Sequence, residues 1–171
     1  ISDYAKGMVT RELVEEVLRL AKGKPVIVDP KVENFDMYAG VSLVTPNNSE
    51  ASLAAGIDIV DDKSLNRAAA VIKDKLGCEA LLITRGEHGM SIFTGGTKKP
   101  HSIPTIAREI FDVSGAGDTV VGVFALALAA GADYKEAAVM SNLAAGIVVE
   151  KLGTATVDIS ELKAAVQKRL K

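Results

Sequence analysis

The sequence has no tryptophan, few aromatic residues and a single cysteine. Aromatic residues make up only 4% of its 171 residues, so an interior must be built from aliphatic side chains. Cys78 has no second cysteine to pair with, which excludes an internal disulfide and fits a reducing compartment. We therefore expect a cytoplasmic protein.

An excess of charge of one sign is also absent. Lys and Arg number 20 against 22 Asp and Glu, and the net charge of −2 gives no support for binding to nucleic acid or to an anionic membrane surface. The longest apolar run, residues 120–130, is far shorter than the roughly 20 residues of a membrane span. It predicts a helix buried on all sides. We expect neither a nucleic-acid nor a membrane partner.

Several catalytic motifs are missing. There is no Gly-x-x-x-x-Gly-Lys-Ser/Thr, which excludes a P-loop enzyme. The pattern Gly115-x-Gly117-x-x-Val120 departs from the dinucleotide fingerprint, because Val120 stands at the third glycine. With 2 histidines and 1 cysteine, a zinc site is not credible.

Short apolar segments alternate with amphipathic ones along the whole chain. Strands are predicted at 26–28, 43–45 and 80–84, with a hairpin or edge strand at 90–93 before a turn at Gly95-Gly96. Helices are predicted at 13–21 (capped by Thr10), 48–55, 63–76, 135–151 and 160–170, with another from about Gly117; residues 97–111 are expected to be irregular or extended. The alternation predicts one α/β domain over residues 1–171, with a largely parallel sheet covered on both faces. Ligands bind such sheets beyond the carboxyl ends of the strands, where Asp29, Thr45 to Asn47, and Thr84 to Gly86 fall.

The run Asp112–Thr119 carries the most chemical information. Glycines at a helix start let an anion approach the bare amides of Gly115, Ala116 and Gly117. A carboxylate there, Asp118, repels an anion unless it takes a proton from an attacking hydroxyl. The pattern therefore points to phosphoryl transfer onto an alcohol. The alternative is a tight turn in which Asp118 only complements the helix dipole.

These eight residues resemble the carboxy-terminal signature of the ribokinase-like (PfkB) carbohydrate kinases, with Val113 where many members have Thr. Segments 2–7, 29–31, 45–50, 84–90 and 142–149 are similar, in the same order, to the heptose 7-phosphate kinase branch. The resemblance runs from Ile1 to about Ala155. It implies a three-layer α/β/α fold that uses ATP and Mg²⁺, here a carboxy-terminal portion without the amino half and its lid.

The reaction that the resemblance implies is phosphorylation of D-glycero-D-manno-heptose 7-phosphate at its anomeric hydroxyl. A homodimer through the missing lid is a further expectation. Two alternatives stay open: another PfkB sugar kinase, and a nucleotide-binding fragment that is inactive on its own.

The resemblance also assigns roles to particular residues. Asp118 becomes the general base, beside the anion hole of Gly115, Ala116 and Gly117. Asn47 and Glu50 serve the Mg²⁺ and phosphate region, Glu50 through water, although the same spacing also predicts an N-cap with a capping box. Thr84 and Gly86 adjoin the nucleotide phosphates and ribose, with a plain turn glycine as the alternative for Gly86.

The resemblance makes three further assignments. Asn142 is placed at the adenine pocket, walled by Ile106 and Ile110; it lies opposite the apolar stripe of its helix and is therefore expected to face solvent or a ligand. Asp112 and Ser114 match positions that hold a monovalent cation in ribokinase-like enzymes, which leaves that ion an open question. Lys6 and Lys31 are candidates for contacts with the sugar phosphate or the γ-phosphate, with solvated surface lysines as the alternative.

Overall fold

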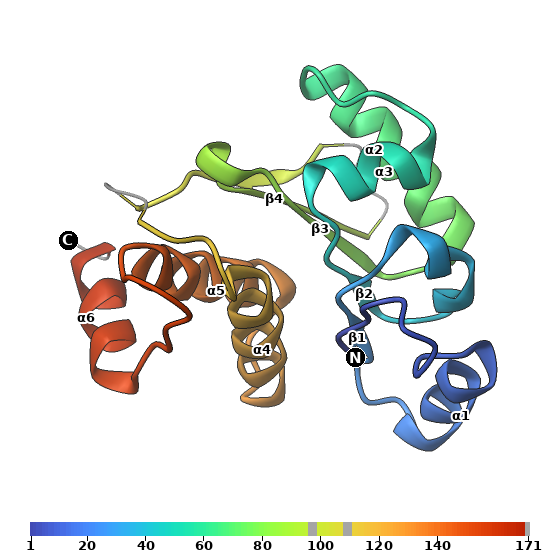
Figure 1. Ribbon diagram of the computed structural model, residues 1–171, viewed down its shortest axis with the longest axis horizontal. Coiled ribbons are helices and arrows are strands. Elements are labelled where there is room, and N and C mark those ends of the chain that lie inside the picture. The colour runs from blue at the N-terminus through green and yellow to red at the C-terminus, as the bar shows by residue number, and fades with distance from the viewer. Residues whose placement is uncertain (96–98, 108–110, 170–171) are drawn as a thin grey trace. The chain divides into compact units, whose positions relative to one another are not determined.

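The computed structural model describes residues 1–95, 99–107 and 111–169 (Figure 1). The predictions that fall on Gly96, Ile110 and Leu170 lie outside these residues. The chain divides into two compact units, which we describe separately. The first unit is Ile1–Arg85 with Ser91–His101, and the second is Gly86–Met90 with Ser102–Lys171. A single domain over residues 1–171 remains a prediction.

The sheet is largely parallel, as the sequence predicts. β1 (Ile27–Val28) pairs in parallel with β2 (Leu43–Val44), and β2 pairs in parallel with β3 (Ala80–Thr84). The strand order is β1-β2-β3-β4-β5, where β4 is Met90–Thr94 and β5 is His101–Ile103. Residues at the chain start lie along the other edge of β1, through a parallel bridge between Ser2 and Asp29. The predicted strand positions are confirmed, but β4 lies between β3 and β5, so the alternative of an edge strand at 90–93 is wrong.

The α-helices of the first unit begin at side-chain caps. α1 (Arg11–Ala21) starts after Thr10, whose hydroxyl accepts the Leu13 amide, and α2 (Asn48–Ala55) starts after Asn47. α3 (Asp62–Leu76) is capped by Asp61. A 3-10 helix, Val32–Tyr38, connects β1 to β2. The core of this unit is mostly aliphatic, as expected; its fully buried side chains include Val14, Leu65, Ile72, Leu81 and Ile83.

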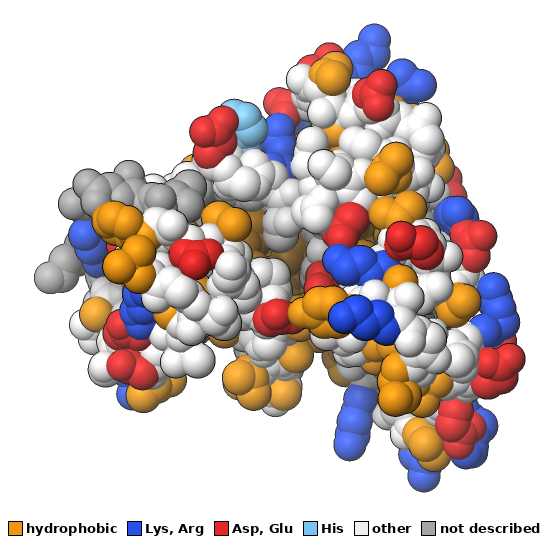
Figure 2. Space-filling model, viewed as in Figure 1, with side chains coloured by type: hydrophobic (Ala, Val, Ile, Leu, Met, Phe, Trp, Pro, Cys, Tyr) orange, Lys and Arg blue, Asp and Glu red, His pale blue; other side chains and the backbone are white. Residues whose placement is uncertain are grey.

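In the part of the second unit that the structure describes, three α-helices follow β5, and the 3-10 helix Gly86–His88 also belongs to this unit. α5 (Tyr134–Val149) packs against both α4 (Ala116–Ala129) and α6 (Ile159–Arg169). The prediction that α4 is buried on all sides is wrong. Val120 and Phe124 are buried, but the Leu126 side chain is 71% exposed, and Figure 2 shows hydrophobic side chains at the surface over α4. Within this unit α5 covers one side of α4, so an apolar helix keeps an uncovered face. No helix among the described residues has the length and hydropathy to span a membrane.

β5 lies within the segment that the sequence predicts to be irregular or extended. Its last residue, Ile103, packs against Gly89, where a Cβ would stand 2.1 Å from the Ile103 carbonyl oxygen. Gly89 also has a positive φ of 76°. The close approach of these two backbones therefore requires glycine, and it depends on residues distant in sequence, which a local pattern does not reveal.

Candidate functional site

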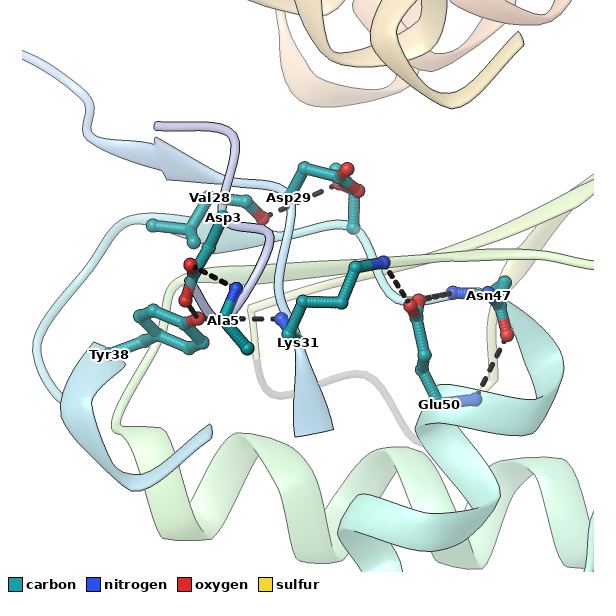
Figure 3. A network of polar contacts seen from close by, with 9 residues as sticks. Asp3, Ala5, Val28, Asp29, Lys31, Tyr38, Asn47 and Glu50 are labelled. Atoms are coloured by element: carbon teal, nitrogen blue, oxygen red, sulfur yellow. Dashed lines mark hydrogen bonds and ion pairs between the residues drawn. The ribbon is translucent and has the colours of Figure 1, made fainter. Parts of the chain in front are cut away.

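In the first unit, a lysine and a carboxylate meet beyond the ends of the parallel strands (Figure 3). The Lys31 ammonium donates to Glu50 Oε1 at 2.8 Å. Glu50 Oε2 accepts the Asn47 amide, and Asn47 Oδ1 accepts the Glu50 amide, both at 2.9 Å. The predicted capping box is confirmed. The hydrogen bond to Glu50 raises the pKa of Lys31 above its usual value, with further help from the charge of Asp29, so this ammonium stays charged at neutral pH.

The strand ends bring together the residues that the sequence places there. Asn47 forms a parallel bridge with Thr84, and the Thr84 amide donates to the Pro46 carbonyl at 3.1 Å. The Thr45 hydroxyl donates to Asp29 Oδ1 at 3.1 Å. These contacts confirm that the ends of β1, β2 and β3 share one edge of the sheet.

The loop after Asp3 carries the other candidate lysine. Lys6 is exposed, and within the described residues no contact joins it to Lys31 or Glu50. The ring centroid of Tyr4 lies 6.0 Å from the Lys31 ammonium. Of the two lysines proposed from the sequence, Lys31 is therefore the one built into the strand-end site.

In the second unit, the start of α4 has the geometry of an open helix N-terminus. Gly115 is the N-cap with a φ of 79°, a conformation that favours glycine, and no side chain caps the helix. The Thr119 amide and hydroxyl both donate to the Gly115 carbonyl at 2.9 Å, which closes the first turn. A Cβ on Gly117 would meet nothing within 4 Å, and Asp118 is exposed in the first turn. Such a helix start can accept an anion beside an accessible carboxylate.

The segment before α4 is organised by Asp112. Its Oδ1 accepts the Ser114 amide at 2.8 Å. Hydrogen bonds from Ser114 and from the Gly153 backbone hold the pKa of Asp112 below its usual value. The carboxylate therefore stays ionised at neutral pH, which is what a cation ligand requires.

Asn142 is buried, with 4% of its surface exposed, and its side-chain amide donates to the Pro104 carbonyl at 2.8 Å. The sequence predicts that Asn142 faces solvent or a ligand. The first of these alternatives is wrong, because residues 141–146 of α5 are all buried and the apolar stripe is not the only covered face. Asn142 instead holds the segment that leads to Ile106. Its contact with a ligand remains a prediction.

A residue that the sequence reasoning missed, Gly146, lies one turn further along α5. A Cβ there would stand 2.5 Å from Ile106 Cγ1, so glycine lets Ile106 pack directly on the helix. The signal was available, since a glycine inside a helical pattern usually has a packing or functional reason. Ile106 and Gly146 line a cavity of about 570 Å³ together with Leu143, Ile147, Ala164 and Ala165, and the charged residues Glu150, Lys168 and Arg169 also line it. This volume, with a mostly apolar lining and a few charged groups, suits a small ligand.

The donor set for a divalent cation is small. Among the described residues, no group of three or more His, Cys, Asp or Glu side chains could hold a metal ion. Mg²⁺ does not need such a cage, since it binds one or two carboxylates together with waters and substrate phosphates. Glu50, next to the Asn47 side chain, fits that requirement.

Comparison with known proteins identifies the family. The profile of the pfkB family carbohydrate kinases matches residues 9–161. The chain therefore belongs to the PfkB carbohydrate kinase family. It is 53% identical over 168 residues to the bifunctional protein HldE of Desulfatibacillum aliphaticivorans, and 47% identical over 171 residues to HldE of Proteus mirabilis. These matches cover 97% and 99% of the chain but only 34% and 35% of the relatives, so the chain spans about a third of their length.

Solved structures confirm the predicted ribokinase-like three-layer α/β/α fold. The ribokinase of Arabidopsis thaliana, solved with ribose and ATP, is 26% identical with a TM-score of 0.80, over 92% of this chain and 53% of that one. The ribokinase of Thermotoga maritima is 26% identical with a TM-score of 0.73, over 90% and 53%. Phosphofructokinase-2 of Escherichia coli, at 20% identity and a TM-score of 0.81 over 96% and 54%, shares the fold.

Proposed function

We propose that this chain is the nucleotide-binding and catalytic portion of an ATP-dependent sugar kinase. Its substrate would be D-glycero-D-manno-heptose 7-phosphate, phosphorylated at the anomeric hydroxyl. The observation that carries the proposal is the open start of α4, with Asp118 beside the amides of Gly115, Ala116 and Gly117, in a chain about half identical to HldE proteins. The product would serve the synthesis of ADP-heptose in the cytoplasm.

Asp118 would act as general base. It would take the proton of the sugar hydroxyl, while the amides of residues 115–117 hold the charge of the transferred phosphoryl group. The exposed side chain and the open space at Gly117 support this role, since both acceptor and phosphate need access.

In the first unit, Glu50 and Asn47 would contribute to the Mg²⁺ and phosphate region, with Glu50 binding the ion through water. Thr84 of this unit would adjoin the nucleotide phosphates. Gly86, in the second unit, has the same proposed role. Bound Mg²⁺ would neutralise phosphate charge. Lys31 would contact the sugar phosphate or the γ-phosphate, and its raised pKa supports this role because the ammonium is charged. Lys6 is a second candidate for the sugar phosphate.

The adenine would lie in the cavity walled by Ile106, with Asn142 fixing the segment that carries Ile106. Asp112 and Ser114 would hold a monovalent cation if the enzyme uses one, and the ionised carboxylate of Asp112 supports that assignment. A homodimer through an amino-terminal lid belongs to the same proposal.

An ADP-release assay tests the proposed function. A longer enzyme that contains this chain is given ATP, Mg²⁺ and one of three acceptors: heptose 7-phosphate, ribose or fructose 6-phosphate. We expect the highest kcat/KM with heptose 7-phosphate. A preference for another sugar would favour a different PfkB kinase, and ATP binding without turnover on any sugar would favour a nucleotide-binding module.

The isolated residues 1–171 make the second arm of the test. We expect them to bind ATP weakly and to transfer phosphate poorly, because positioning the acceptor can be worth about 7–11 kcal/mol of the barrier. Turnover equal to that of the longer enzyme would mean that this chain carries its own complete acceptor site.

A further inference from the structure

A buried carboxylate at the start of the chain has no role in the function proposed above. Asp3 is only 2% exposed. It accepts hydrogen bonds from the Ala5 amide at 2.8 Å, from the Asn34 side chain at 2.7 Å, and from the Tyr38 hydroxyl. Burying a carboxylate is costly unless such partners compensate it, so this cluster is a built feature rather than a surface contact.

The Tyr38 hydroxyl connects this carboxylate to the strand-end site. Tyr38 ends the 3-10 helix Val32–Tyr38, and its side chain is fully buried. The hydroxyl donates to Asp3 and accepts the backbone amide of Lys31 at 3.4 Å (Figure 3). The same residue, Lys31, places its ammonium on Glu50. Hydrogen bonds therefore link Asp3 through Tyr38 to the Lys31 backbone amide, and the Lys31 side chain connects that backbone to Glu50.

The same carboxylate also shapes the loop that follows it. Ala5 has a φ of 52°, in the left-handed region that is uncommon for residues other than glycine. Its amide is held by Asp3 Oδ1, which keeps the backbone in this conformation. Asp3 thus holds the loop that carries Tyr4 and Lys6. Through Tyr38 it also holds the backbone at Lys31, where the segment after β1 begins.

We propose that Asp3 and Tyr38 are positioning residues that hold Lys31 so that its ammonium points at Glu50. The effect of these residues on catalysis rests on the proposed function, in which Lys31 contacts a phosphate of the substrates. Neither Asp3 nor Tyr38 touches the reacting atoms; they act through the Lys31 backbone.

The protonation states support this direction of hydrogen bonding. Burial raises the pKa of Tyr38, and its bond to Asp3 raises that pKa further, so the phenol keeps its proton. Burial alone would raise the pKa of Asp3, but the bonds from Tyr38, Asn34 and backbone amides outweigh it and hold the pKa below its usual value. At neutral pH the phenol therefore donates to an ionised carboxylate and keeps a lone pair for the Lys31 amide.

The test compares Tyr38→Phe with Tyr134→Phe, the same chemical change in α5 of the other unit, where Tyr134 packs on Phe124. The first readout is the pKa of Lys31, followed by NMR in residues 1–171 with ¹³C-labelled lysine. In Tyr38→Phe we expect this pKa to fall toward the usual lysine value, because the Lys31–Glu50 pair loosens. In Tyr134→Phe it should stay raised.

The second readout is sugar phosphorylation by the longer enzyme. Tyr38→Phe should lower kcat/KM about tenfold, the order expected for one lost hydrogen bond. Combined with Lys31→Met, it should cost less than the sum of the two single changes, because both act through Lys31. Asp3→Asn should repeat the Lys31 pKa shift, and it replaces Tyr38→Phe if that variant does not fold.

An unchanged Lys31 pKa in folded Tyr38→Phe and in Asp3→Asn would overturn the positioning role. Additive losses of kcat/KM in the double variant would overturn it as well. A wild-type enzyme without turnover on any sugar would refute the proposed kinase instead, and the Lys31 titration would still decide whether Tyr38 positions this lysine.

Discussion

The Lys31 ammonium lies 2.8 Å from Oε1 of Glu50, while the other oxygen of that carboxylate closes the capping box of α2. One side chain thus starts a helix and holds a cation at the same time. The structural and functional interpretations of the Asn47-x-x-Glu50 spacing are therefore compatible. They can be separated by a change that keeps the cap and removes the charge.

Glu50→Gln makes that separation. A glutamine oxygen can still accept the Asn47 amide, so we expect the free energy of unfolding to change by no more than about 1 kcal/mol. Loss of the charge should raise the Mg²⁺ concentration needed for half-maximal kinase activity. Glu136→Gln is the matched control, because Glu136 closes the equivalent capping box of α5 on Asp133. An identical Mg²⁺ dependence in both variants would remove Glu50 from the metal region.

Gly146→Ala tests the packing of Ile106 on α5. The new Cβ would collide with Ile106 Cγ1, and we expect a loss of about 1–3 kcal/mol in stability, with weaker ATP binding. Ile106→Val should recover part of both losses. Gly122→Ala in α4 is the control, since a Cβ there meets nothing within 4 Å and alanine favours a helix by about 0.5–1 kcal/mol. Urea unfolding measures the stability of each variant, and ATP titration measures its affinity for ATP. If Gly146→Ala binds ATP as tightly as the wild type, the contact between Gly146 and Ile106 does not contribute to nucleotide binding.

Local patterns were sufficient for much of the fold. The apolar run 80–84 and the helix 48–55 were predicted with the bounds that the structure gives, because a short apolar segment and the Asn47 cap are encoded in neighbouring residues. The edge of the sheet that gathers Asp29, Thr45 and Thr84 followed from the parallel topology.

Features that depend on distant contacts were not predictable in this way. The helical projection placed Asn142 away from the apolar stripe, but Pro104, 38 residues earlier, covers it. The exposed face of α4 and the close packing of Gly89 on Ile103 likewise depend on which elements meet in space. The hydrogen bond between Asp3 and Tyr38 joins residues 35 positions apart, so no local motif indicated it.

Asp3 should make the stability of residues 1–171 depend on acid. Because its hydrogen bonds hold its pKa below the usual 3.8, the unfolded chain takes up this proton first as the pH falls. The stabilisation is complete above the unfolded pKa and is lost as the pH drops through the lower folded pKa. The free energy of unfolding should therefore fall more steeply from about pH 5 to about pH 3 in the wild type than in Asp3→Asn. Equal slopes in urea titrations would contradict this assignment.

Gly117→Val tests the anion hole at the start of α4. A branched side chain would obstruct a phosphate there, and loss of such a donor site costs about 10²–10³-fold in kcat. Gly122→Val makes the same substitution in the same helix, at a position where a Cβ also meets nothing within 4 Å, and should lose far less. Steady-state rates of the two folded variants decide the matter, and equal losses would argue against an anion hole at Gly117.

Asp118→Asn in the longer enzyme tests the central claim most directly, by single-turnover transfer of phosphate from bound ATP to heptose 7-phosphate. The exposed side chain should tolerate the change, so the fold and the ATP affinity should be kept. We predict that the rate of transfer falls by about 10²–10⁴-fold, the usual contribution of a general base. A rate within about a factor of three of the wild type would contradict Asp118 as the base, since general-base catalysis is worth far more than that.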